Sequence, residues 1–202
     1  SDAWHAICDA ADNGKSRWTI KLLQDISIDE QTGYGNSVTW KLDLAGKTFK
    51  INKLSVYNAG DGQQNITIKD SSAAQTGKIE ATGTATEPIN IGGGCTVTLE
   101  SGSIVNTNGT AVVLKDNKNK NSAHFVMKGG AVSGTTALTA DSGTVTISNG
   151  TVTGTVADTT DRGTAAVVVG ADVTMTLKGG SVTNTNGTAI AINGTNAQFT
   201  MS

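Results

Sequence analysis

The chain repeats a short pattern in which an apolar, a polar and an apolar residue are followed by a turn that contains glycine. The pattern is clearest in Val97–Gly102 and in Met175–Gly180. Similar three-residue units occur around Ile20, Leu42, Ile66, Phe125, Val145 and Phe199. Alternating apolar and polar residues are typical of half-buried β-strands, and their recurrence along the chain indicates a repeat array. The sequence therefore predicts an all-β solenoid.

Three short strands separated by tight bends make up each turn of this predicted coil, as between Val97 and Leu114. The first strands, centred on Ile20, Leu42, Ile66, Val97, Phe125, Val145, Met175 and Phe199, follow one another at steps of 20 to 31 residues. The longer steps contain polar insertions at residues 115–122 and 157–162, which a solenoid accommodates at its corners without disturbing the stacked strands. We expect one domain, residues 1–202, with about seven coils in residues 18–202.

The two ends of the chain differ from its middle. Apolar residues at helical spacing in residues 2–12 predict a short amphipathic helix, and all three tryptophans fall in the first 40 residues, at Trp4, Trp18 and Trp40. A first coil has no neighbour on one side, so we interpret residues 1–17 and these rings as a cap rather than as an aromatic platform for sugars. Residues 199–202 resemble the start of another coil and the chain opens with Ser1, so we expect a piece of a longer solenoid.

A four-residue motif, Asn-Thr-Asn-Gly, occurs identically at residues 106–109 and 184–187. Asn and Gly tolerate the left-handed backbone that a sharp corner needs, and we assign both motifs to corners. Asn-Gly-Thr also begins at Asn108, Asn149, Asn186 and Asn193. These triplets match the acceptor sequence for N-glycosylation in a eukaryotic secretory protein, but turn chemistry explains them more simply.

Several of these sequence features resemble those of a known fold family. Residues 18–25, residues 42–48 and the later units that place Gly two residues before Ile or Val resemble the right-handed parallel β-helix of the pectate-lyase type. In texture the repeats are most similar to those of secreted and surface proteins of Gram-positive bacteria. The resemblance implies a single-stranded, three-sided, right-handed parallel β-helix, and it covers nearly the whole chain. It implies little about function, because this architecture supports lyases, hydrolases, adhesins and inert spacers.

Composition and charge disfavour some classes of binding partner. Charged residues make up 16% and aromatic residues 4% of the chain, which has 25 Gly and one Pro, and this composition is too apolar for disorder. A formal net charge of -2 predicts no basic stripe and disfavours binding to nucleic acid or to anionic membranes. The apolar run Ala165–Val169 is too short to cross a bilayer, so no membrane insertion is expected.

The two cysteines, Cys8 and Cys95, have no metal-ligand spacing around them. Two small buried thiols are the simpler interpretation. A disulfide between the N-terminal segment and the repeats is the alternative, and it would favour an oxidising compartment.

The outward positions of the first strands bear on catalysis. One predicted column contains Thr67, Thr98, Val126, Thr146, Thr176 and Thr200, and the next contains Lys69, Glu100, Lys128, Ser148, Lys178 and Ser202. A pectate-lyase-like enzyme needs carboxylates that hold calcium and a basic residue that removes a proton, and a hydrolase needs two neighbouring acids. Neither column provides these groups, so the sequence predicts no catalytic residue, no metal site and no cofactor.

The threonines of these strands also suggest an ice-binding array. His124 and Val126 interrupt the array, and threonine is a common residue at exposed strand positions. We therefore interpret the threonines as ordinary strand residues.

The two insertions provide the remaining candidate binding residues. They are Asp116, Lys118, Lys120 and His124 in one insertion, and Asp158, Asp161 and Arg162 in the other. Loops at the corners of a rigid rod often carry binding residues, although ordinary solvated loops would have the same composition. Two carboxylates without a calcium-loop signature do not define a metal site.

The sequence and the resemblance together favour a non-catalytic, rigid β-helical module of a bacterial secreted or cell-surface protein. Its expected role is adhesion to a glycan or to a host protein, for example a glycoprotein or an immunoglobulin. The alternative is a polysaccharide-active enzyme of the β-helix type, either a lyase or a glycoside hydrolase. We expect no nucleic acid partner.

Overall fold

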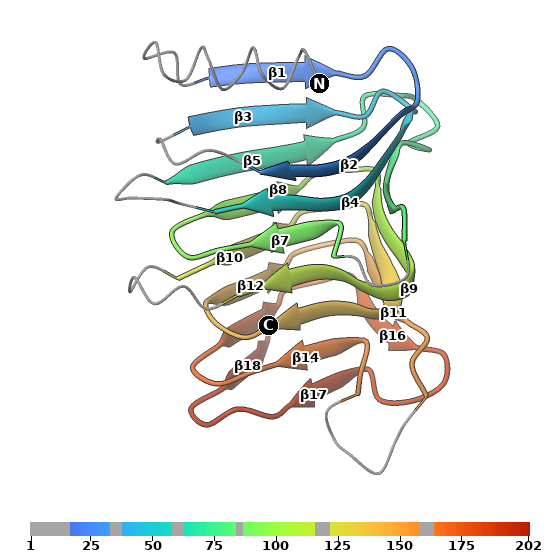
Figure 1. Cartoon of the computed structure of the whole chain (residues 1–202). Helices are drawn as coiled ribbons and strands as arrows, with labels where there is room; N and C mark the ends of the chain where they lie inside the picture. Colours follow the sequence, from blue (N-terminus) through green and yellow to red (C-terminus); the bar gives the residue numbers. More distant parts are fainter. Residues whose placement is uncertain (1–16, 33–37, 58–62, 84–86, 116–121, 158–163) are drawn as a thin grey trace.

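The computed structural model is a parallel β-solenoid of about 6 turns. It describes residues 17–32, 38–57, 63–83, 87–115, 122–157 and 164–202. Figure 1 shows the strands stacked along one axis, from β1 at the top to β17 and β18 at the bottom. The described part of the chain contains no helix. The helix predicted within residues 2–12 lies outside the described residues, and Arg17, which we had assigned to the cap, is the first residue of β1.

The first strands of the successive coils form an eight-stranded parallel sheet, sheet A. Its strands are, in spatial order, β1 (Arg17–Lys21), β3 (Val38–Asp43), β5 (Gln64–Lys69), β8 (Thr96–Leu99), β10 (His124–Met127), β12 (Thr144–Ile147), β15 (Thr174–Leu177) and β18 (Gln198–Met201). Each strand contains one of the eight positions that the sequence aligned. The predicted number and order of first strands are therefore confirmed.

The remaining strands form a second, ten-stranded parallel sheet, sheet B. Its main path is β2 (Ile26–Thr32), β4 (Thr48–Val56), β6 (Lys78–Ala81), β9 (Ser103–Leu114), β11 (Ala131–Ala140), β13 (Thr151–Gly154) and β16 (Ser181–Asn184). The short strands β7 (Ile89–Ile91), β14 (Val167–Val169) and β17 (Ile190–Ile192) pair with the second halves of the long strands or with each other. Sheet B therefore contains two successive ladders, joined by strands that run through both.

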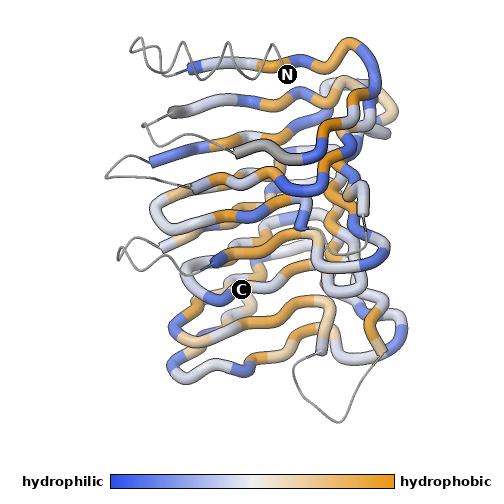
Figure 2. The backbone as a smooth tube through the Cα atoms, viewed as in Figure 1, coloured by the Kyte–Doolittle hydropathy of each residue, from blue (hydrophilic) through white to orange (hydrophobic). Residues whose placement is uncertain are grey.

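Alternation along each short strand separates the core from the surface, and Figure 2 shows it as alternating hydrophobic and hydrophilic segments. In β8, Val97 and Leu99 are fully buried, whereas Thr96 and Thr98 are half-buried. The hydrogen-bond register places Val97 beside Ile66 on one side and beside Phe125 on the other. Stacked inward residues thus form continuous aliphatic columns, which the sequence predicted.

One step of the predicted alignment is wrong by two residues. Leu42 pairs with Ile68, and Trp40 pairs with Ile66. Trp18 pairs with Trp40 in turn, so both rings belong to an inward column. Trp40 is 3% exposed and belongs to the core, which excludes it from an aromatic sugar platform.

The two identical Asn-Thr-Asn-Gly motifs share one pattern of side-chain hydrogen bonds, although residues 106–109 lie within β9, beside a register shift against β11, and residues 185–187 form a bend after β16. The side-chain amides of Asn106 and Asn184 each donate at 3.0 Å to the carbonyl four residues later. Their Oδ1 atoms each accept the amide of the residue two positions later, at 3.2 Å. No residue of either motif has a positive φ. The assignment to a corner therefore holds for residues 185–187, whereas residues 106–109 belong to the long strand β9. Side-chain hydrogen bonds shape both motifs, and the predicted left-handed backbone is absent from them.

Glycine is required at the bend after β10. Gly130 has φ +79°, and a Cβ atom placed there would lie 2.4 Å from the carbonyl oxygen of Gly102 in the preceding coil. The bends of neighbouring coils therefore stack as closely as the strands do.

The described cysteine, Cys95, is fully buried in the core. Burial raises the pKa of its thiol, against an opposing hydrogen bond with the backbone of Gln64. A buried thiol of this kind packs as a small apolar side chain. Cys8 lies outside the described residues.

The register of β8 gives a matched test of the core. We expect Leu99→Ala to lower the free energy of unfolding by about 2–5 kcal/mol, because it opens a cavity in a stacked column. Thr98→Ala, one residue away on the opposite face, should change it by less than about 0.5 kcal/mol. Urea unfolding followed by circular dichroism measures both values, and equal effects of the two substitutions would contradict the assigned faces.

Candidate functional site

The outward face of sheet A is a regular surface formed by eight parallel strands. Its register defines three columns of side chains that run across the strands. The first column contains Arg17, Thr39, Asn65, Thr96, His124, Thr144, Thr174 and Gln198, and the second contains Thr19, Lys41, Thr67, Thr98, Val126, Thr146, Thr176 and Thr200. The predicted outward threonine column, from Thr67 to Thr200, is thereby confirmed.

The third column lies at the carboxyl ends of the strands. It contains Lys21, Asp43, Lys69, Glu100, Lys128, Ser148, Lys178 and Ser202. From Glu100 onward, each residue of this column donates its backbone amide to the carbonyl of an inward residue one strand earlier, as Lys128 does to Leu99 at 2.8 Å. These bonds hold the column in the same register as the sheet.

Positive charge gathers on this face of an otherwise acidic chain. Of the 15 Lys and Arg residues of the chain, six project from these three columns: Arg17, Lys21, Lys41, Lys69, Lys128 and Lys178. The columns contain two acidic residues, Glu100, which is exposed, and Asp43, which is 4% exposed. The absence of a basic stripe, which we had inferred from the net charge, is therefore wrong for this face.

His124 is the one predicted binding residue that the structure describes. It lies in the first column of sheet A, and its Nδ1 shares a hydrogen bond of 2.7 Å with Thr144 Oγ1 on the neighbouring strand. The other predicted binding residues, Asp116, Lys118, Lys120, Asp158, Asp161 and Arg162, lie outside the described residues. The structure thus places His124 on a sheet and not in a loop.

Asp70, at the carboxyl end of β5, is 5% exposed and organises the bends of two coils. Its Oδ1 accepts the backbone amides of Gly46 at 2.7 Å and of Ser72 at 2.9 Å, and its Oδ2 accepts the amide of Gly77. Burial alone would raise the pKa of this carboxyl group, but these hydrogen bonds outweigh it and hold the pKa below its usual value. Asp70 is therefore an ionised structural group.

Asp43 has the same role one coil earlier. Its Oδ1 accepts the amides of Ser71 at 3.0 Å and of Ala45 at 3.1 Å, and its Oδ2 lies 3.6 Å from Lys69 Nζ. Burial would raise the pKa of Asp43, but its bonds with Ser71 and Ala45 and the charge of Lys69 lower it overall. These two buried aspartates were not predicted from the sequence, because Asp43 ends β3 and Asp70 directly follows β5, where aspartate commonly begins a solvated turn.

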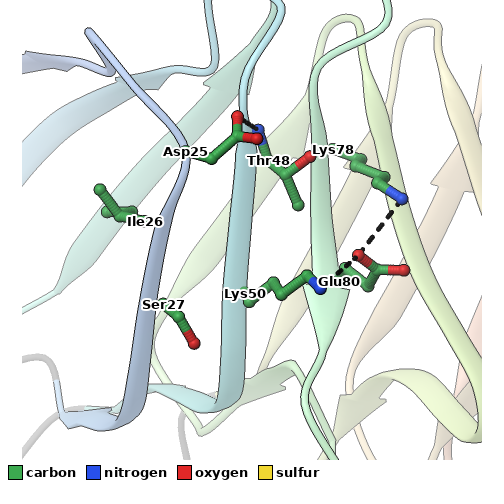
Figure 3. Close-up of a pocket in the computed structure, with 7 residues that line it drawn as sticks. All are labelled: Asp25, Ile26, Ser27, Thr48, Lys50, Lys78 and Glu80. Atoms are coloured by element: carbon green, nitrogen blue, oxygen red, sulfur yellow. Dashed lines mark hydrogen bonds and ion pairs between the residues drawn. The ribbon is translucent and has the colours of Figure 1, made fainter.

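A groove of about 400 Å³ lies on the outward face of sheet B, across β2, β4 and β6. Figure 3 shows its lining side chains, which come from Asp25, Ile26, Ser27, Thr48, Lys50, Lys78 and Glu80. Glu80 lies 3.2 Å from Lys78 Nζ and 3.9 Å from Lys50 Nζ. Asp25 accepts the backbone amide of Thr48 at 2.8 Å.

Sequence reasoning missed this groove, although a signal was present. Lys50 and Glu80 are partners in the register of β4 and β6, and opposite charges at paired positions attract each other across a sheet. The pairing of Lys50 with Glu80 can be recognised in the sequence only after β4 and β6, which belong to coils of different length, have been aligned.

Two other kinds of feature, a metal site and a membrane-spanning helix, are absent from the described residues. The described part of the chain contains no group of three or more His, Cys, Asp or Glu side chains that could hold a metal ion. No helix within the described ranges is long and apolar enough to span a membrane. No family model, no curated protein and no solved structure matches this chain.

The buried aspartates predict a dependence of stability on pH. The folded-state pKa of Asp70 lies below the unfolded value of about 3.9, so its contribution is present above that pH and is lost as the pH falls through the folded pKa. Asp70→Asn should lower the free energy of unfolding at pH 7 by about 1–3 kcal/mol. The asparagine side chain has a single acceptor oxygen, which cannot accept hydrogen bonds from all three backbone N–H groups.

Urea unfolding between pH 7 and pH 2.5 tests this prediction. The difference in the free energy of unfolding between wild type and Asp70→Asn should shrink towards low pH. Asp29→Asn, a change at an exposed carboxylate of β2, should leave the dependence of the free energy of unfolding on pH nearly unchanged. A difference between wild type and Asp70→Asn that is constant with pH would show that the charge of Asp70 has no role.

Proposed function

We propose that the chain is a non-catalytic, rigid binding module of a secreted or cell-surface bacterial protein, which adheres to a glycan or a host protein. A right-handed, three-sided β-helix of the pectate-lyase type and a Gram-positive source are part of this proposal. The observation that supports it most is the outward face of sheet A, where eight strands in one register present three ordered columns of polar and basic side chains.

Rigidity makes this face suited to binding. Beneath it, inward residues such as Ile68, Leu99 and Met127 are fully buried and lie side by side in the register. Side chains held by such a scaffold lose little conformational freedom when a ligand binds, so less of the binding free energy is spent on ordering. Flat, repetitive ligands gain most from this arrangement, since several equivalent contacts form at once.

The groove on sheet B supports the alternative function, a polysaccharide-active enzyme. It places two carboxylates, those of Asp25 and Glu80, on the walls of one depression. A glycoside hydrolase uses two carboxyl groups on opposite sides of the bond that it cleaves. However, Glu80 already lies 3.2 Å from Lys78 Nζ and 3.9 Å from Lys50 Nζ, an arrangement typical of a structural ion pair.

Binding and turnover can be measured together on one panel. We expect the purified chain to bind at least one immobilised polysaccharide, mucin or immunoglobulin saturably, and to release no reducing ends or unsaturated sugars from it. Surface plasmon resonance measures the binding, and product analysis by mass spectrometry measures the turnover. Absence of binding to every member of the panel would overturn the proposed function.

The alternative function has its own test. If the groove is catalytic, Glu80→Gln abolishes turnover of a polysaccharide substrate while Glu87→Gln, a change at a carboxylate outside the groove, leaves it intact. We expect no turnover by wild type on the same panel. Turnover that depends on Glu80 would contradict the proposed binding module and support the polysaccharide-active enzyme.

A further inference from the structure

Lysines recur at a fixed interval in the third column of sheet A. Lys21, Lys69, Lys128 and Lys178 occupy equivalent positions on β1, β5, β10 and β15, which are alternate strands of the sheet. Neighbouring strands lie about 4.8 Å apart, so the strands that carry these lysines are about 9.6 Å apart. The sheet thus presents a row of positive charges with a regular spacing.

The positions between these lysines leave most of the row charged. Asp43 is buried, accepts two backbone amides and lies 3.6 Å from Lys69 Nζ, so it offsets part of the charge of that one lysine. Ser148 and Ser202 are exposed and uncharged, which leaves Glu100 as the one exposed acid among the described residues of the column. Lys128 and Lys178 are exposed and form no ion pair with any described residue.

Hydroxyl groups accompany the lysines. Thr67 and Thr176 lie two residues before Lys69 and Lys178 on the same outward face. A ligand along this row would therefore meet a cation at each repeat and a threonine hydroxyl beside three of the four lysines, whereas Val126 lies beside Lys128. This combination fits a polymer that alternates acid groups with hydroxyl groups.

An extended polysaccharide with one acid group per disaccharide has this chemistry, and its repeat length is comparable with the interval between the lysines. Single-stranded nucleic acid fits less well. It presents a phosphate on every nucleotide, and proteins bind it by stacking bases on aromatic side chains, whereas Trp18 and Trp40 belong to the inward column. The geometry favours a sugar polymer laid along the solenoid axis.

We propose that the lysine column of sheet A, Lys21, Lys69, Lys128 and Lys178, binds an extended acidic polysaccharide that carries one carboxylate per disaccharide. The inference rests on the proposed function as a binding module and names the ligand class and the surface. Binding is electrostatic, with each lysine placed near one carboxylate and the threonine hydroxyls near the sugar hydroxyls.

Hyaluronan, which has one carboxylate per disaccharide, is the probe, and dextran is the neutral control. The test variant is Lys128→Ser with Lys178→Ser, because serine already occupies this column at Ser148 and Ser202. The matched control is Lys53→Ser with Lys115→Ser, which removes the same charge from the side of sheet B. Thermal unfolding checks that both variants remain folded.

We expect wild type to bind hyaluronan and not dextran, with an affinity that falls as salt rises. The test variant should bind about tenfold more weakly and with a smaller dependence on salt, because two solvent-exposed contacts are lost. The control variant should bind as wild type does. Equal binding by the test variant and wild type would overturn the inference.

A gain of affinity provides a second arm. Glu100→Lys fills the gap between Lys69 and Lys128 and removes the exposed acid of the column, so it should strengthen hyaluronan binding by about threefold to tenfold. An unchanged or weaker affinity would contradict the proposed path of the polymer.

Different results would overturn the binding module and its acidic polysaccharide ligand. If hyaluronan does not bind but another member of the earlier panel does, the inference falls and the binding module stands. If nothing in the panel binds, both fall. Tighter binding to single-stranded DNA or to phosphatidylserine vesicles than to hyaluronan would also overturn the inference, because the face would then recognise a different class of anion.

Discussion

The parallel ladder of hydrogen bonds between successive coils is the constraint on which the rest of this structure depends. It places each residue beside its counterpart one coil earlier, so a single residue type at one position becomes a column. Inward columns must be apolar and of fitting volume, since protein interiors are close-packed. Outward columns are free to vary, and any chemistry that recurs there is automatically aligned. Both the core and the candidate binding face follow from this one rule.

The strands of sheet A were predictable because the pattern of apolar and polar residues has period two and the turns contain glycine. The wrong step, Leu42 aligned with Ile66 and not with Ile68, shows the limit of that signal. A shift of two residues keeps every side chain on the same face, so periodicity alone does not distinguish the two registers. The choice depends on how Trp40 packs against the next coil, which is a property of the folded state.

The buried carboxylates mark a second limit. Asp43 ends β3 and Asp70 follows β5, positions where aspartate usually begins a solvated turn, yet their oxygens accept amides from the bends of two coils. Only the stacking of one bend on another brings those amides together. The same holds for the sheet B groove, where Lys50 and Glu80 come from coils of unequal length. Features that depend on one strand could be predicted, whereas features that depend on the relative placement of two bends could not.

The candidate binding face shows why net charge is a poor guide for a solenoid. Most of the third column, from Lys69 to Ser202, could be predicted from the sequence, but the place of Lys21 and Asp43 in it depends on the register of β1, β3 and β5. The Debye length is about 8 Å in physiological salt, shorter than the length of a sheet of eight strands about 4.8 Å apart. A ligand on sheet A therefore responds to the few charges near it and not to the acidic groups on other faces. A formal charge of -2 thus coexists with a basic surface, and in a repeat protein the charge of each outward column is the quantity that bears on binding.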